Sequence, residues 1–355
     1  MEKYFNIHNL VQVVVSSDNP SLMKDVLCQL SEFEVTADCS SKAVDLRIFD
    51  YSSKPKLRRP VAISKYYYYE DGVIDIPEEM FCANLIAPRI DVYCKYFALP
   101  VNFLIELVLV RKKHTLIHAA AVSLKGENYL FPAFGGVGKT TAIAGFIDGG
   151  GKLFGDDMII VNSEELLGYP IDFSVYPYHL GVLPIKDENI IKKLKITKRL
   201  DEAIFFLGQT DLLLANFIKK VIQHFKIPLF NISPRVLFGI NNIVMRGKPV
   251  RIFYLERLAA ADKLAVNKIN EDKLSIICAD ILFHEWHQSL RIMYAYCALS
   301  GFSMEALFQE IKLIYKELFT RYGCSVIAIP EAISDQEYQR ELIARVTGNK
   351  CDEVE

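Results

Sequence analysis

The sequence feature that most constrains the fold of this chain is a glycine-rich run between a strand-like segment and a helix-like segment. Residues 128–134 (NYLFPAF) are apolar and predict a strand, whereas 141–150 (TAIAGFIDGG) have helical spacing and end in glycines. Between them, 133–140 (AFGGVGKT) match the pattern GxxxxGK followed by serine or threonine, except that alanine replaces the first glycine. Residues 152–161 (KLFGDDMIIV) then predict a single strand. The order strand, glycine loop, helix, strand is that of a nucleotide-binding α/β core.

The residue types of this loop have the chemistry of a phosphate site. Glycines let successive backbone N–H groups turn inward around phosphate oxygens, a lysine reaches the β- and γ-phosphates, and a hydroxyl binds Mg²⁺. The helix that follows adds its positive N-terminal end to the same anion. The residues expected around the phosphates are Gly135, Gly136, Val137, Gly138, Lys139, Thr140 and Thr141. The alternative is a glycine-rich turn that has no chemical role.

Two adjacent aspartates in the strand after the helix narrow the kind of chemistry. Asp156 and Asp157 are neighbours, so in a regular strand their side chains point to opposite sides. One carboxylate can then hold the Mg²⁺ shell while the other faces a substrate hydroxyl. In-line phosphoryl transfer to an alcohol requires both a metal across the β/γ-oxygens and a base for the proton of the nucleophile. The alternative is that one aspartate only caps a turn.

Residues 114–161 resemble the core of HPr kinase/phosphorylase and its related kinases. In that family a histidine-bearing strand, a P-loop, a glycine before the next strand and an Asp-Asp pair follow in this order, as they do here. Phosphoenolpyruvate carboxykinase is a more distant relative with a similar GKTT loop and GDD strand, and the spacing here favours the kinase branch. The resemblance implies an α/β fold with ATP and Mg²⁺ as cofactors. Hexamers occur in the family, so a homo-oligomer is expected.

The resemblance also implies roles for individual residues. The glycine loop would cradle the ATP phosphates, Lys139 would neutralise the transferring charge, and Thr140 with Asp157 would hold Mg²⁺. Asp156 would be the general base, and His118 would lie beside the phosphate site. The alternative for His118 is a structural histidine on an apolar strand.

The chain departs from the family where the substrate is selected. The glycine- and arginine-rich signature with which HPr kinases recognise HPr does not occur, and the corresponding residues 168–184 read GYPIDFSVYPYHLGVLP. We therefore expect a kinase that phosphorylates another hydroxyl, of a protein, a peptide or a small molecule. Candidate anion-binding residues outside the loop are Arg235, Arg246 and Arg251. A nucleotide-binding regulatory module without phosphotransfer and a carboxykinase-like lyase are the alternatives.

Strand and helix patterns divide the chain into three parts. Residues 1–105 predict an N-terminal α/β accessory domain, 106–260 the P-loop kinase core, and 261–355 a mainly helical C-terminal region. The pair Asp71-Gly72 predicts a hairpin turn, and Ser334, with glutamate three residues later, predicts the start of a helix. The strands expected outside the loop region are 11–17, 45–51, 61–77, 116–124, 251–258 and 324–330, and the helices are 21–30, 102–113, 274–299 and 304–323.

Composition excludes several classes of protein. The formal net charge of −2 gives no global basic surface of the kind that binds nucleic acid, and the basic stretches 55–60 and 192–199 are read as solvated faces. The first ten residues lack the pattern of an export signal, and no run of about 18 apolar residues occurs. We expect a cytoplasmic protein without nucleic-acid or membrane partners.

Two patterns that suggest metal sites do not hold. The eight cysteines form no CxxC pair, which argues against a zinc site or a disulfide framework. The sequence His284-Glu285-Trp286-His287 is similar to a metalloprotease helix, but that motif places its histidines four residues apart, and the fourth position here is Gln288. We expect a structural or surface role for this segment.

Overall fold

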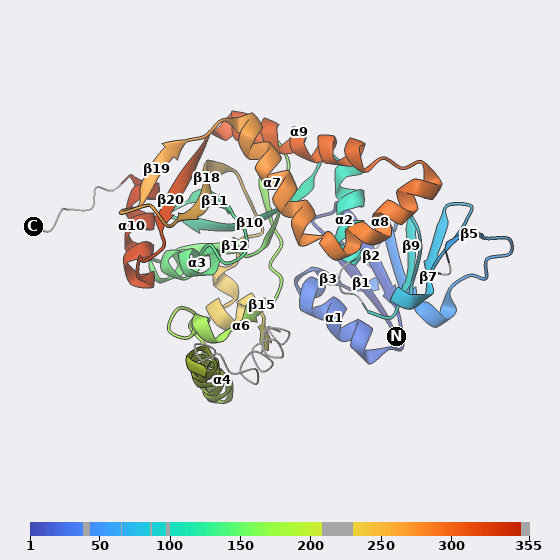
Figure 1. Cartoon of the computed structure of the whole chain (residues 1–355), viewed down its shortest axis with the longest axis horizontal. Helices are drawn as coiled ribbons and strands as arrows, with labels where there is room; N and C mark the ends of the chain where they lie inside the picture. Colours follow the sequence, from blue (N-terminus) through green and yellow to red (C-terminus); the bar gives the residue numbers. More distant parts are fainter. Residues whose placement is uncertain (38–42, 65, 86, 97–99, 208–229, 349–355) are drawn as a thin grey trace, which may run out of the picture.

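Two mixed β-sheets dominate the fold of the computed structural model, which describes residues 1–37, 43–64, 66–85, 87–96, 100–207 and 230–348. The sheets lie at opposite ends of the molecule, and helices run across the top of the view from one to the other (Figure 1). The described helices are α1 (Pro20–Leu30), α2 (Pro100–Arg111), α3 (Lys139–Asp148), α4 (Glu188–Leu207), α6 (Pro234–Phe238), α7 (Glu271–Glu285), α8 (His287–Ser300), α9 (Met304–Tyr322) and α10 (Asp335–Thr347). The chain thus has the predicted α/β class.

The first sheet is built by the N-terminal residues. Its strands are β1 (Glu2–Ile7), β2 (Val11–Ser16), β3 (Glu34–Val35), β4 (Leu46–Asp50), β5 (Val61–Ser64), β6 (Tyr67–Glu70), β7 (Val73–Ile76), β8 (Phe81–Asn84) and β9 (Ile90–Cys94), in the order β3-β1-β2-β4-β9-β8-β7-β6-β5. The predicted hairpin is confirmed, because β6 and β7 pair antiparallel around Asp71 and Gly72, which have φ of 48° and 83°. Both values suit the primed turns that join such strands.

The second sheet contains the strands on either side of the glycine loop. Its strands are β10 (Thr115–Leu124), β11 (Glu127–Pro132), β12 (Lys152–Gly155), β13 (Met158–Val161), β14 (Leu166–Gly168), β17 (Arg246–Gly247), β18 (Pro249–Leu258), β19 (Ala265–Lys268) and β20 (Cys324–Pro330). They run β17-β14-β13-β10-β11-β18-β20-β19, with β12 paired to β10. The short strands β15 (Phe173–Val175) and β16 (Phe230–Ile232) form a separate antiparallel pair.

Two predicted elements are each interrupted. The predicted strand 152–161 is wrong as a single element, because β12 ends at Gly155 and β13 begins at Met158. The predicted helix 274–299 is likewise divided into α7 and α8 at Trp286, whose amide bonds back to the carbonyls of Leu282 and Phe283, each at 3.2 Å. The Trp286 side chain is 4% exposed, so packing of this large ring accompanies the break.

The second sheet takes strands from both sides of the predicted boundary at residue 260. β20 pairs parallel to β18, and β19 pairs antiparallel to β20. The predicted start of α10 is confirmed, since the Ser334 hydroxyl accepts a hydrogen bond from the Glu337 amide at 3.3 Å. From this helix, the Gln339 amide donates to the carbonyl of Thr141 in α3 at 3.0 Å. The three-part division stays a prediction, and the C-terminal residues complete the sheet behind the glycine loop.

One apolar core joins the two sheets. A continuous cluster of buried side chains includes members from the first sheet, from α2, from the second sheet and from α7 and α9, among them Val13, Leu107, Ile117, Ile281 and Tyr315. A second cluster lies on the other face of the second sheet, under α3 and α10. Apolar burial on this scale is the main stabilising contribution to such a fold. The first sheet is therefore held to the second by a shared hydrophobic interior.

A buried carboxyl group ties α2 to β10. Glu106 is fully buried, accepts a hydrogen bond from the Leu116 amide at 2.7 Å, and is hydrogen-bonded to the hydroxyl of Thr115. Burial raises the pKa of Glu106 to about 8, although both hydrogen bonds act in the opposite direction. The Thr115 hydroxyl also donates to the Leu116 carbonyl at 3.1 Å, so a protonated Glu106 can donate to Thr115 and complete the network.

The variant Glu106→Gln is expected to remove a pH dependence of stability. Between the ordinary pKa of 4.5 and about 8, Glu106 is protonated in the folded chain and ionised in the unfolded one. The free energy of unfolding therefore falls as pH rises through this window, by up to about 5 kcal/mol from this group. Urea unfolding at pH 5 and pH 8 measures the change. Glutamine should flatten this dependence, whereas Glu317→Gln, an exposed change on α9, should leave it as in the wild type.

Candidate active site

The glycine loop occupies the turn between β11 and α3. Gly136 and Gly138 have φ of 78° and 121°, a region that side chains with a Cβ rarely adopt. A Cβ added to Gly138 would also lie 3.2 Å from the ring of Tyr338 in α10. Backbone conformation and crowding therefore both require glycine at position 138. Lys139 begins α3, which places its amide among the free N–H groups of the first turn.

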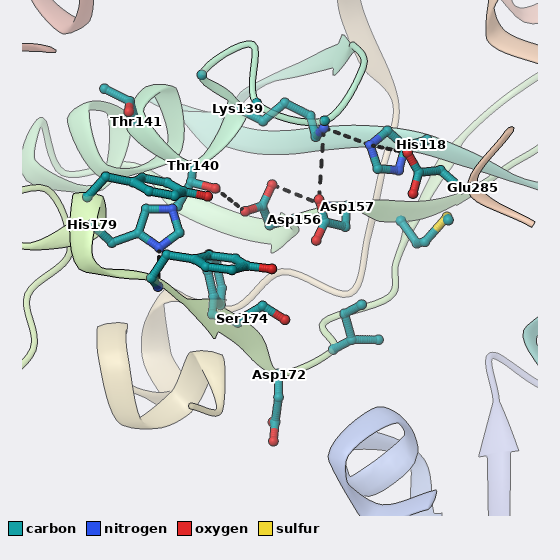
Figure 2. A pocket seen from close by; sticks show the side chains of 18 of the residues that line it. His118, Lys139, Thr140, Thr141, Asp156, Asp157, Asp172, Ser174, His179 and Glu285 are labelled. Carbon is teal, nitrogen blue, oxygen red and sulfur yellow. Dashed lines mark hydrogen bonds and ion pairs between the residues drawn. The ribbon is translucent and has the colours of Figure 1, made fainter. Parts of the chain in front are cut away.

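The lysine of the loop lies in a buried polar cluster with His118. Its Nζ is 2.8 Å from His118 Nε2 and donates to the carbonyls of Ala133 at 3.4 Å and Phe134 at 3.2 Å (Figure 2). Burial, and then the charge of Lys139, lower the pKa of His118 to about 3. A neutral imidazole accepts the lysine proton at Nε2, so its own proton resides on Nδ1. The structure thus brings together two of the residues singled out in the sequence.

The two aspartates lie in a sharp bend. Asp157 has a φ of 70°, a left-handed conformation that aspartate tolerates better than most residues, and the Met158 amide donates to the Asp156 carbonyl at 2.9 Å. Because the strand is broken here, both carboxylates line the same cavity, and the expected projection to opposite sides of a strand does not apply.

The environments of the two aspartates differ. The Thr140 hydroxyl donates to Asp156 Oδ2 at 2.7 Å, and Asp156 is 7% exposed. Burial, followed by the charge of Asp157, raises the pKa of Asp156. The Asp157 side chain is 51% exposed, and its Oδ1 lies 3.9 Å from Lys139 Nζ. These contacts pair Thr140 with Asp156, not with Asp157 as the resemblance implies.

A cavity of about 790 Å³ opens in front of the loop and the bend. Its volume is within the range of sites for small ligands and cofactors. Figure 2 shows Asp172, Ser174 and His179 across from Thr140 and the aspartates. The wall includes residues of the N-terminal part, Gln29 of α1 and Asn102 of α2, which lie far from the loop in sequence. No sequence pattern predicted their participation.

Aromatic side chains form one wall of this cavity. Tyr176 and Tyr178 stack with ring centroids 5.3 Å apart, and Tyr178 meets His179 edge-on at 4.3 Å. Tyr178 remains 64% exposed. These residues belong to 168–184, the segment in which the HPr-recognition signature is absent. The departure from the family in this segment indicated a different substrate-recognition region, but it did not indicate an aromatic surface.

The arginine that lines the cavity is not one of those proposed from sequence. Arg257, at the end of β18, donates through Nε to the Val137 carbonyl at 3.0 Å and through Nη1 to the Glu331 carbonyl at 3.2 Å. Arg235 is paired with Glu32, Arg246 is paired with Glu165, and Arg251 lies outside the cavity lining. Parallel pairing of β18 with β11 places residue 257 beside the loop, which spacing alone does not reveal.

The segment from His284 to His287 has mixed roles. His284 is largely exposed and Trp286 is buried, in line with the surface and structural roles expected. Glu285 nevertheless lines the cavity, and its Oε1 lies 3.8 Å from His118 Nε2. The comparison with the metalloprotease motif gave no indication that Glu285 lines a cavity.

The described residues contain no cluster of three or more His, Cys, Asp or Glu side chains suited to a metal ion. The pair Thr140 and Asp156 offers oxygen atoms, and Mg²⁺ is usually held by one or two carboxylates together with substrate phosphates. The six cysteines that the structure describes are free thiols.

No described helix is both long and apolar enough to span a membrane.

Comparisons with known proteins give only a distant structural similarity. No family model matches the chain. No curated protein matches it either. Among solved structures, the chain is similar to the Hpr(Ser) kinase/phosphatase from Coxiella burnetii, with 12% identity, a TM-score of 0.27, and coverage of 66% of this chain and 96% of that chain.

Proposed function

We propose that the protein is an ATP- and Mg²⁺-dependent kinase that transfers the γ-phosphate to a hydroxyl of a protein, a peptide or a small molecule. The observation that carries the proposal is the hydrogen bond between Thr140 of the glycine loop and Asp156, with Lys139 and Asp157 beside it in one cavity. A P-loop hydroxyl next to an acidic residue is the arrangement that holds Mg²⁺ in nucleotide-binding proteins.

The contacts favour a division of labour between the two aspartates. Thr140 and Asp156 would hold Mg²⁺, which would supply positive charge to the phosphate groups during transfer. Asp157 is half-exposed and lines the cavity, and it would accept the proton of an incoming hydroxyl. This allocation is the reverse of the one that the family resemblance implies.

The other residues of the site would bind the phosphates of ATP and orient them for transfer. The loop amides from Gly135 to Thr141 would surround the phosphates, and Lys139 would move from His118 to the transferring group. His118 would remain beside the site as a neutral hydrogen-bonding group. Such a site accelerates transfer chiefly by positioning and by electrostatic stabilisation.

Label transfer from ATP tests the proposal. The purified chain is incubated with γ-labelled ATP in a cell extract with Mg²⁺, with excess EDTA, or with the Lys139→Ala variant in place of the wild type. We expect label in one acceptor class with the wild type and Mg²⁺ only. Label that resists both EDTA and Lys139→Ala would contradict the assignment. Nucleotide binding without any labelled species would favour a regulatory module.

A further inference from the structure

The cavity contains further carboxylates beyond the two aspartates of the bend. Asp172 and Glu285 both line the cavity, and neither forms an ion pair with a lysine or arginine among the residues that the structure describes. The two basic side chains of the lining, Lys139 and Arg257, are bonded to carbonyls of the glycine loop. A charged group bound next to either of these carboxylates is therefore favoured if it is a cation.

Glu285 lies beside the cluster of His118 and Lys139. Its Oε1 is 3.8 Å from His118 Nε2 and 3.9 Å from His284 Nδ1. Burial and the charge of Asp157 raise the pKa of Glu285, while Lys139, His284 and His287 oppose them. Lys139 Nζ lies 3.9 Å from Asp157 Oδ1 and 2.8 Å from His118 Nε2, so a chain of close contacts links the proposed base to Glu285 along one wall of the cavity.

Two buried donors belong to neighbours of Glu285, since Trp286 follows it in the chain and His118 approaches it in space. Among the residues with a described position, none hydrogen-bonds to Trp286 Nε1 or His118 Nδ1, although these two residues are only 4% and 5% exposed and both line the cavity. Nδ1 carries the imidazole proton because Nε2 accepts from Lys139. A buried donor without a partner is energetically unfavourable, and a ligand oxygen would satisfy it. A carbonyl or carboxylate oxygen has the complementary chemistry.

We propose that the acceptor is a β-hydroxy-α-amino carbonyl compound of the serine type, with its ammonium group bound by Glu285. The proposal rests on the kinase function above. The hydroxyl is presented to Asp157, the ammonium group to Glu285, and the carbonyl oxygen to the donors of Trp286 and His118. In the transfer, the bond from the hydroxyl oxygen to the γ-phosphorus forms as the bond to the β,γ-bridging oxygen breaks. Asp157 takes the hydroxyl proton, and ADP leaves with the electron pair.

Matched ligands separate the groups of this acceptor. Free serine and an N-terminal seryl residue of a peptide share the same chemistry, so both sources are tested. The probes are L-serinamide, N-acetyl-L-serinamide, which lacks the cation, and the tripeptide amide Ser-Ala-Ala-NH2. Saturation-transfer NMR titration with Mg²⁺ and a non-hydrolysable ATP analogue measures the affinity of the wild type, Glu285→Gln and the exposed control Glu317→Gln.

In the wild type and in Glu317→Gln, serinamide should bind at least about tenfold more tightly than its acetylated form, and Glu285→Gln should abolish that ratio. A purely structural role for Glu285 would weaken both ligands and leave the ratio unchanged. Tighter binding of the tripeptide indicates a peptide N-terminus, and its exclusion indicates a free amino acid. Equal binding of the acetylated probe, an unchanged ratio in Glu285→Gln, or no binding of either amine would overturn the inference.

The nucleotide titration keeps the two proposals distinguishable. If the ATP analogue binds and the amine preference is absent, the serine-type acceptor is wrong while the kinase proposal stands. If the analogue does not bind the wild type with Mg²⁺, the kinase proposal itself fails, together with the acceptor that depends on it.

Discussion

Asparagine in place of Asp157 is expected to reduce the rate of phosphate transfer by about 10³-fold, within the range that removal of a positioned general base produces. Asparagine has nearly the same shape and tolerates the left-handed φ of 70° at this position, so the bend should persist. The variant should still bind nucleotide, because the pairing of Thr140 with Asp156 is untouched. Single-turnover transfer and a fluorescent ATP analogue measure the two properties separately.

Asp156→Asn is the matched comparison. It removes the charge that accompanies Thr140, so it should weaken the Mg²⁺-dependent part of nucleotide binding as well as transfer. If Asp156→Asn binds Mg²⁺ and nucleotide normally but fails in transfer, while Asp157→Asn loses metal dependence, the allocation implied by the family resemblance is the right one. Titration of Mg²⁺ at fixed nucleotide decides between them.

Lys139→Ala is expected to lower the rate constant for transfer by about 10³-fold, since it removes a positive charge that would face the transferring phosphoryl group. The same change should raise the pKa of His118, because the charge of Lys139 is the second largest cause, after burial, of its low value. NMR titration of the imidazole detects this shift without any assay of activity. Burial persists in the variant, so the His118 pKa should stay below the ordinary histidine value.

An exposed lysine supplies the control. Lys263→Ala removes the same charge from the surface near β19 and should leave both transfer and the titration of His118 unchanged. Full activity in Lys139→Ala would exclude the lysine from the chemistry. An unchanged His118 titration there would mean that the contact at 2.8 Å does not persist in solution.

Local features of this chain were predictable because local rules determine them. Asp71-Gly72 forms the expected hairpin, Ser334 caps the expected helix, and the glycine loop lies between a strand and a helix. Each depends on residues within a few positions of one another. The break at Asp156-Asp157 was missed because aspartate in a left-handed conformation leaves no mark in an otherwise apolar strand pattern.

The parts of the site that sequence did not reveal come from long-range packing. Arg257 reaches the loop because β18 pairs beside β11, and Glu285 reaches His118 because α7 packs against β10. The order of strands in a sheet depends on contacts between distant residues, which one sequence does not encode as a readable pattern. Arg235 and Arg246 were reasonable candidates by residue type, yet each is paired with a glutamate elsewhere.

The hydrophobic interior that joins the two sheets limits how such a protein can change over evolutionary time. Gln29 and Asn102 in the cavity wall belong to helices on the N-terminal side, and α2 is part of the shared core. Recombination that replaced the N-terminal part with an unrelated one would expose that core and remove the wall together. A new ligand specificity of the cavity would therefore arise through point substitutions in the wall, and each of them would also be selected by its effect on folding.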